Sequence, residues 1–178
     1  LAQVAVLTTA QAKALTTDQV QALTTAQLLL DLKKATPGLR LSFGVSTFVP
    51  KAHTPFQWEG VRPEADKRLK LLAKRLKPKG IELRPESYGW SVIQALLSRS
   101  DRRLAPVIAA ARGSHESLGG WKKAYREMAK EATPALPAWD DVIHASWSHD
   151  RVLPWEHLEG PLPKATLHKH RDEALAPR

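Results

Sequence analysis

The chain has 178 residues, of which 43% are hydrophobic and 25% are charged, and its formal net charge at pH 7 is +9. These values are ordinary for a globular protein with a core. The sequence contains no cysteine, which excludes disulfides, thiolate nucleophiles and cysteine-ligated clusters formed by this chain alone. No apolar run approaches the roughly 18 residues of a membrane helix, and the N-terminus lacks a secretory signal pattern, so we expect a cytoplasmic protein without a membrane partner.

Residues 1–27 repeat with a period of eight, as LTTAQAKA from Leu7, LTTDQVQA from Leu15 and LTTAQLLL from Leu23. Each repeat places a threonine three residues before a glutamine, which is the spacing of a helix capping box. Eight residues turn a helix by about 80° beyond two full turns, so one long helix would not keep these leucines on one face. We therefore predict short capped helices, with new starts at Thr16 and Thr24, that act as a spacer or extend the neighbouring domain.

Residues 28–60 predict a helix, a strand and a loop. The helix ends at Pro37-Gly38 and offers Leu28, Leu29 and Leu32 for burial. Leu39–Val49 alternates in polarity and is rich in β-formers, which indicates a strand.

Residues 61–178 predict a helical C-terminal extension. A helix begins at Pro63 and runs to about Lys77, with apolar residues on one side at Leu69, Leu72 and Leu76, and IELRP forms a second short strand. Further helices are predicted at about Ser87–Arg99, Arg102–Ala111, Gly120–Ala132 and Lys164–Leu175. Between the last two, Thr133–Pro163 is rich in proline and carries Trp139, Trp147 and Trp155, so we expect it to wrap against a surface. The predicted fold class is α+β, mainly α-helical.

Three sequence blocks occur in order: STFVPKAHTPFQW at Ser46–Trp58, ALLSRSDRRLAPVI at Ala95–Ile108 followed by GGW at Gly119–Trp121, and LPWEHLEGPLPKATL at Leu153–Leu167. Through these blocks, the chain from about Gln27 onward resembles the C-terminal part of a family of radical SAM proteins. Members are often joined to a cobalamin-binding-like domain, and the similarity is closest to cyanobacterial members. The resemblance implies that Leu39–Val49 is a late strand of a partial (β/α) barrel and that the loop after it lies at the barrel mouth.

In that family, a CxxxCxxC loop holds a four-iron four-sulfur cluster that cleaves S-adenosylmethionine. This chain has none of those cysteines and does not contain the earlier strands that would carry them. The resemblance therefore implies a non-catalytic, substrate-side or core-capping portion that binds neither cofactor alone and whose partner is the missing N-terminal barrel. A natural fragment, a processed product and an engineered chain all stay open as its origin.

The loop after the predicted strand contains the candidate substrate-side or cofactor-side residues Lys51, His53, Thr54 and Gln57. Lysine offers a fixed cation and histidine a group that titrates near neutrality, while the flanking prolines hold both at low entropic cost. The alternative is that His53, Thr54 and Gln57 satisfy backbone groups while Phe56 and Trp58 pack beneath them. In a chain without the rest of the barrel, the second interpretation is favoured.

Two sets of basic residues are candidate anion-binding groups. Arg102 and Arg103 follow Asp101, a pattern that also suits a capped helix start with surface ion pairs. Lys67, Lys70 and Lys74 belong to eight basic residues within eighteen positions, which indicates a surface for RNA or another polyanion, or simply a solvated helix face.

No catalytic residue or metal-ligand set is predicted. Glu156 and His157 are adjacent and share a role only if a turn brings them together, while His168 and His170 lie about 200° apart on a helix and do not chelate jointly. Three functions stay open: the radical SAM portion, a basic module that binds nucleic acid or another polyanion, and an inactive repeat-containing structural or engineered chimera.

Overall fold

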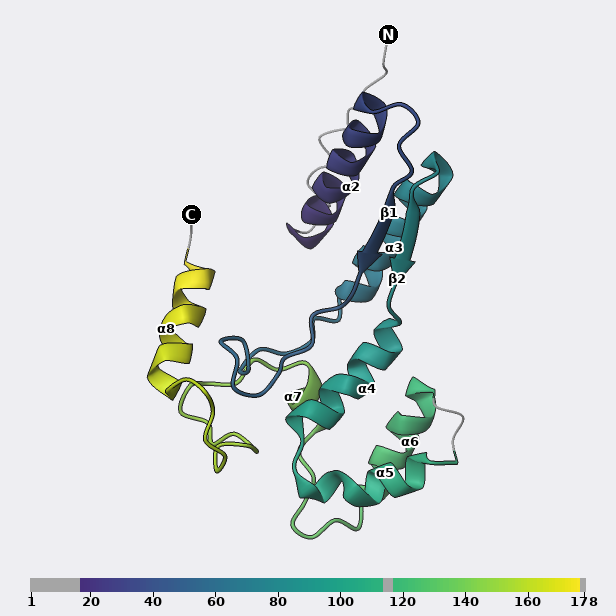
Figure 1. Ribbon diagram of the computed structural model, residues 1–178. Helices are drawn as coiled ribbons and strands as arrows, with labels where there is room; N and C mark the ends of the chain where they lie inside the picture. The colour runs from purple at the N-terminus through teal and green to yellow at the C-terminus, as the bar shows by residue number, and fades with distance from the viewer. Residues whose placement is uncertain (1–16, 114–116, 177–178) are drawn as a thin grey trace. The chain divides into compact units, whose positions relative to one another are not determined.

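The computed structural model describes residues 17–113 and 117–176 (Figure 1). This part of the chain is mainly helical, with seven α-helices and one two-stranded parallel sheet, which confirms the predicted α+β class. The chain divides into two compact units. We call Leu1–Val45 with Glu64–Pro85 the sheet unit, and Ser46–Pro63 with Glu86–Arg178 the helical unit.

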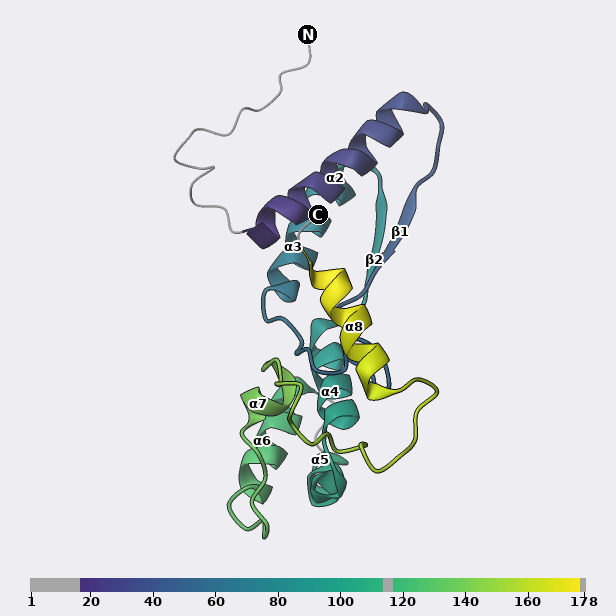
Figure 2. The ribbon, with the colours of Figure 1, turned by 90° about the vertical axis from the view of Figure 1, so that its left-hand side faces the viewer.

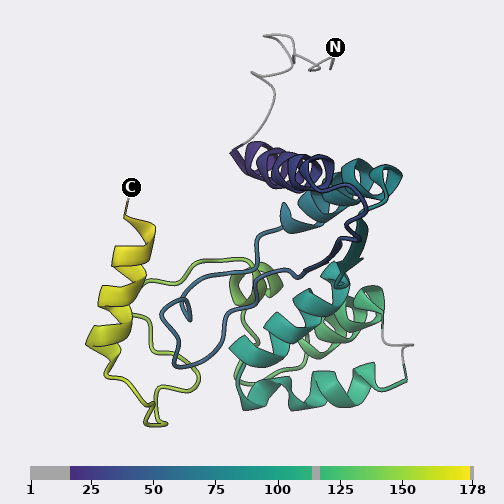
Figure 3. The same cartoon turned by 45° about the horizontal axis from the view of Figure 1, so that its top comes forward.

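The sheet unit contains α2 (Thr17–Ala35), β1 (Ser42–Val45), α3 (Ala65–Leu76), the 3-10 turn η1 (Lys77–Lys79) and β2 (Glu82–Pro85). The two strands pair in parallel with Phe43 opposite Leu83, and α3 lies between them in sequence. Helices α2 and α3 lie side by side (Figures 2 and 3). Their shared core with the strands consists of Ala22, Ala26, Leu72, Leu76, Ile81 and Leu83.

Helix α2 runs unbroken through Thr24, so the predicted helix start at that residue is wrong. Two alanines one turn apart, Ala22 and Ala26, are buried in the core shared with α3, and Leu29 and Leu30 are partly buried against the same core. Leu28 and Leu32, which were predicted to be buried, are instead 66% and 47% exposed. The first repeat and Thr16 lie outside the described residues.

The remaining sheet-unit predictions hold in outline. Leu69, Leu72 and Leu76 are buried on one side of α3, and IELRP contains β2. Strand β1 is shorter than the predicted Leu39–Val49, because its pairing with β2 ends at Pro85, which has no amide proton for the ladder.

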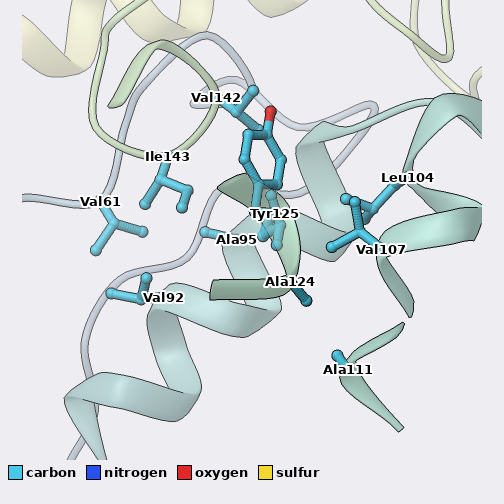
Figure 4. Close-up of a cluster of buried hydrophobic side chains, with 11 residues drawn as sticks. Val61, Val92, Ala95, Leu104, Val107, Ala111, Ala124, Tyr125, Val142 and Ile143 are labelled. Carbon is cyan, nitrogen blue, oxygen red and sulfur yellow. The ribbon is translucent and has the colours of Figure 1, made fainter. Parts of the chain in front are cut away.

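The helical unit contains α4 (Tyr88–Arg99), the 3-10 turn η2 (Arg102–Leu104), α5 (Ala105–Ala111), α6 (Leu118–Met128), α7 (Trp139–Ile143) and α8 (Lys164–Leu175). The four predicted helices are confirmed with small shifts at their ends, whereas the short α7 was not predicted. Side chains from α4, α5, α6 and α7 form one core with Val61, and the ring of Tyr125 lies within it (Figure 4).

The wrapping segment, Thr133–Pro163, packs as predicted. Trp147 and Trp155 are buried and form a second cluster with Trp58, Leu153 and Leu167, the last of these from α8. Within the residues that the structure covers, none of the helices has the length and apolarity needed to cross a bilayer.

Candidate functional site

The aromatic loop, Phe48–Trp58, is folded on itself by its own polar groups. The Thr54 hydroxyl donates to the carbonyl of Lys51 at 2.7 Å, and the backbone N–H of Gln57 donates to the carbonyl of Thr54 at 3.1 Å. The backbone N–H of His53 donates to Gln57 Oε1 at 2.9 Å. These bonds close Lys51 to Gln57 into a turn whose shape is set by the loop itself.

Gln57 also ties the loop to the wrapping segment. Its side chain is buried, and Oε1 accepts a second hydrogen bond from the indole N–H of Trp155 at 2.8 Å. The amide oxygen of Gln57 and the hydroxyl proton of Thr54 are therefore both used inside the protein. This geometry favours the structural interpretation for these two residues.

Lys51 and His53 are the ionisable groups of the loop. His53 is partly exposed and has a φ of 57°, a left-handed conformation that is uncommon for a residue other than glycine. Its ring packs directly on Gly160, where an added Cβ would lie 2.8 Å from His53 Cγ. Lys51 is exposed on the same short turn.

A buried arginine at the end of α4, Arg99, was missed by the sequence-based prediction. It is 1% exposed, and it donates to the carbonyls of Val142 at 2.7 Å, Ile143 at 3.2 Å and Ala145 at 2.9 Å. Burial, followed by the charge of Arg151, lowers the pKa of Arg99 to about 10. One signal in the sequence was its helical spacing, since it lies three and four residues after buried positions of α4.

Trp147 stacks with two guanidinium groups. The guanidinium carbons of Arg99 and Arg151 lie 3.7 and 4.2 Å from its ring centroid. Arg151 pairs with Asp141 through two hydrogen bonds of 3.0 and 2.7 Å, and these bonds lower the pKa of the Asp141 carboxyl. The Trp147 indole N–H donates to the backbone carbonyl of Asp141 at 2.9 Å. Asp141 therefore holds both the Trp147 ring and the Arg151 guanidinium that stacks on it.

A pocket of about 230 Å³ opens beside this stack. Its lining carries three arginines, Arg99, Arg103 and Arg151, together with Asp101 and Tyr125. Most of the other lining residues are apolar, and they include the Trp147 ring. The pocket lies entirely within the helical unit.

The two arginines that were predicted to bind anions occupy different positions. Arg103 forms a two-point pair with Asp101, at 2.9 Å through Nε and 2.7 Å through Nη2, and donates to the carbonyl of Ala135 at 2.6 Å. This pairing lowers the pKa of Asp101 and raises that of Arg103. Arg103 lines the pocket, whereas Arg102 is exposed and is not part of the lining.

The predicted lysines lie on α3 in the sheet unit, and all three are exposed. Lys77 follows Lys67, Lys70 and Lys74 at the same spacing of three or four residues. At about 100° per residue, the four lysines lie within about 80° of one another around the helix axis. Lys70 pairs with Asp66 at 2.5 Å. We call these four lysines the lysine stripe. The stripe belongs to the sheet unit, whereas the pocket lined by Arg99, Arg103 and Arg151 belongs to the helical unit.

Histidines from two segments meet against Trp58. The rings of His149 and His168 stack with centroids 4.0 Å apart, and Trp58 lies 5.0 and 4.3 Å from them. Arg171 donates to His149 Nε2 at 3.1 Å and pairs with Glu59 at 2.5 Å. Burial, and next the neighbouring His149, lowers the pKa of His168.

The other candidates of the PWEH motif have separate environments. Glu156 accepts from the backbone N–H of Leu153 at 2.9 Å and pairs with Lys164 at 2.5 Å, whereas His157 is exposed. Among the described residues, no group of three or more histidines, aspartates and glutamates is arranged to hold a metal ion. Because iron–sulfur clusters are held by thiolates and the sequence has no cysteine, the residues of this chain do not fit such a cluster.

Comparison with known proteins gives a distant, partial similarity. The chain is 26% identical over 84 residues to the uncharacterized protein MJ0966 of Methanocaldococcus jannaschii. The match covers 47% of this chain and 19% of that protein, so the chain spans less than a fifth of the length of this relative. No protein-family model matches the chain, and no solved structure matches it.

Proposed function

We propose that this chain is the non-catalytic C-terminal portion of a radical SAM enzyme, on the substrate side of the missing barrel or capping its core. The observation that carries the proposal is the β1–α3–β2 unit, in which two parallel strands are joined through a helix. The aromatic loop begins three residues after the last residue of β1. In (β/α) barrels, binding sites are built from the loops that follow the carboxyl ends of the strands.

The uncovered part of the sheet supports the same proposal. Phe43 and Leu83 pack in the core with the helices, whereas the alternate residues Ser42, Gly44, Glu82 and Arg84 are exposed. In the described part of the chain, each strand pairs only with the other. Parallel sheets are normally covered on both faces and extended by further strands, and a barrel would supply both.

Under this proposal the iron–sulfur cluster and S-adenosylmethionine belong to the partner barrel, which carries the thiolate ligands. This chain contributes Lys51 and His53, held by a loop whose polar groups are already paired internally. A cation and an imidazole on a turn closed by its own hydrogen bonds are suited to binding and orienting a polar substrate group.

An association measurement tests the proposal. The probe is a cluster-bearing barrel fragment from a radical SAM protein that shares the HTPFQW block, truncated before the strand that corresponds to β1. Analytical ultracentrifugation should show a one-to-one complex with this chain, and a radical SAM barrel from a protein without that block serves as the control. Absence of a complex, or a stable brown cluster formed by this chain alone on anaerobic reconstitution, would contradict the proposal.

A second candidate function, binding of RNA or another polyanion, is favoured by the lysine stripe of α3. Replacing Lys67, Lys70 and Lys74 together by glutamine should reduce the salt dependence of single-stranded RNA binding by about two logarithmic units per decade of salt. The matched control replaces three exposed lysines of the helical unit, Lys123, Lys130 and Lys169. Equal salt dependence in the two triple variants would exclude the stripe as the binding surface.

A further inference from the structure

Arg99 is a buried cation whose hydrogen bonds all go to neutral groups. The acceptors of its hydrogen bonds are the backbone carbonyls of Val142, Ile143 and Ala145, and no ion pair among the described residues includes it. Its Nε donor is buried without a partner. A buried charge without a counterion is costly, and an orphaned buried donor adds to that cost.

The pocket beside Arg99 has an excess of positive charge. Arg103 and Arg151 also line it, and their carboxylate partners, Asp101 and Asp141, balance two of the three guanidinium charges. The remaining charge is that of Arg99. Nearby Arg151 adds to the effect of burial in lowering the pKa of Arg99, whereas the carboxylates of Asp141 and Glu59, which pair with Arg151 and Arg171, act in the opposite direction.

Donors remain available for a ligand in the pocket. A guanidinium has five N–H groups, and Arg151 directs two of them, one from each Nη, at Asp141. A phosphate or carboxylate accepts such donors in charge-assisted hydrogen bonds. Apolar wall residues such as Leu104, Val142 and Leu153 offer packing for a non-polar ligand body.

We propose that this pocket binds a small organic anion, with its phosphate or carboxylate against Arg151 and Arg103 and its apolar body against the wall. The ligand supplies the negative charge that balances the third guanidinium, that of Arg99, which has no ion pair among the described residues. The competing role for Arg99 is purely structural, as a tie between α4 and the carbonyls of the wrapping segment. That role alone requires no ligand, so binding distinguishes the two.

The binding test uses the full chain and calorimetric titration with four probes. Phenyl phosphate and benzoate represent the two classes of organic anion, inorganic phosphate carries the charge without the ring, and benzyl alcohol carries the ring without the charge. We expect a Kd of about 1 mM or tighter for one of the two organic anions. Inorganic phosphate and benzyl alcohol, the two controls, should bind more weakly. No binding of either organic anion, or equal binding of benzyl alcohol, would overturn the proposal.

A residue at the pocket rim provides a variant that leaves the core intact. Val152 lines the pocket and is 80% exposed. Val152→Glu places a negative charge there and should weaken binding of the organic anion about tenfold relative to Val152→Gln, which has the same size and no charge. Arg151→Met should weaken it at least as much, with Arg126→Met, an exposed arginine outside the lining, as its control.

Equal affinity in the Val152→Glu and Val152→Gln variants would place any bound anion elsewhere and sink the proposal. Arginine Nε–Hε resonances give an independent readout, because ligand in the pocket should shift signals of Arg151 and Arg99 and leave Arg126 unchanged. The pocket lies within the helical unit, so this binding does not depend on the proposed radical SAM function.

Discussion

Gly60→Ala tests how the aromatic loop is held against the wrapping segment. Two backbone hydrogen bonds flank this glycine: Val61 N–H donates to Ile143 at 2.8 Å, and Trp147 N–H donates to Trp58 at 2.7 Å. A Cβ on Gly60 would overlap the carbonyl of His144 and lie 2.9 Å from the carbonyl oxygen of Ala145. The obstacle is backbone, so no side-chain rotation relieves it.

The cost of that overlap follows from what must move. Overpacking costs about 1–3 kcal/mol, and separating the two segments weakens two hydrogen bonds worth about 1 kcal/mol each. We therefore expect Gly60→Ala to lower the free energy of unfolding by about 3–5 kcal/mol, a large part of the total stability of a domain of this size.

Urea unfolding followed by circular dichroism measures the effect. The matched control is Gly89→Ala in α4, where the new Cβ would lie 3.6 Å from Leu118 Cβ in ordinary contact. This substitution should be neutral or stabilise by up to about 1 kcal/mol, because alanine favours helix over glycine. A Gly60→Ala protein as stable as the Gly89→Ala protein would refute the packing described for the loop.

Three further predictions concern side chains of the helical unit. Gln57→Leu removes the acceptor for Trp155 and should lower the free energy of unfolding in urea by about 2–4 kcal/mol. Gln57→Glu keeps an acceptor and should lower it less. Equal losses of stability in the two variants would contradict the role of this hydrogen bond. Arg99→Leu leaves three carbonyls without their donor and should cost about 3 kcal/mol or more, and a loss below about 1 kcal/mol would show that these bonds contribute little. His168 has a lowered pKa in the folded state, so its protonation favours unfolding. The free energy of unfolding should therefore fall as the pH drops from about 7 to 5, and His168→Gln should reduce that fall. The same pH profile in the variant would exclude His168 as the cause.

Elements with strong local signals were predictable from the sequence. Ser87 caps α4 by accepting from the backbone N–H of Trp90, and α8 has the bounds predicted from the sequence. Helix α3 begins at Ala65, two residues after the predicted start at Pro63, and it buries its predicted leucines. Caps, prolines and helical periodicity act over a few residues, so a single sequence contains the information.

Helix α2 shows where local reasoning fails. Its leucines drift around the helix, and this drift predicted several short helices. The buried stripe consists instead of alanines, whose burial depends on the neighbouring α3 and is weakly marked by hydrophobicity. Tertiary packing therefore stabilises one continuous helix despite the capping-box spacing.

The candidate site was predictable only in its local part. The bond between Thr54 and Lys51 spans three residues and follows from the sequence of the turn. Trp155 and Gly160, which position Gln57 and His53, lie about a hundred residues away from them in sequence. The carbonyls that Arg99 binds lie 43 to 46 residues after it. Such contacts are set by the tertiary fold. Helical spacing places Arg99 on the buried side of α4, but it does not identify the carbonyls that Arg99 binds.

The central proposal is tested most directly by cleavage of S-adenosylmethionine under reducing, anaerobic conditions, with 5′-deoxyadenosine as the product measured. We expect no 5′-deoxyadenosine from this chain alone. We expect the cluster-bearing barrel fragment to form more 5′-deoxyadenosine when this chain is added. Lys51→Ala should diminish that gain, and Lys123→Ala, an exposed lysine on α6, should not. Product formed by this chain alone, or a barrel fragment whose activity is unchanged by the chain, would contradict the account.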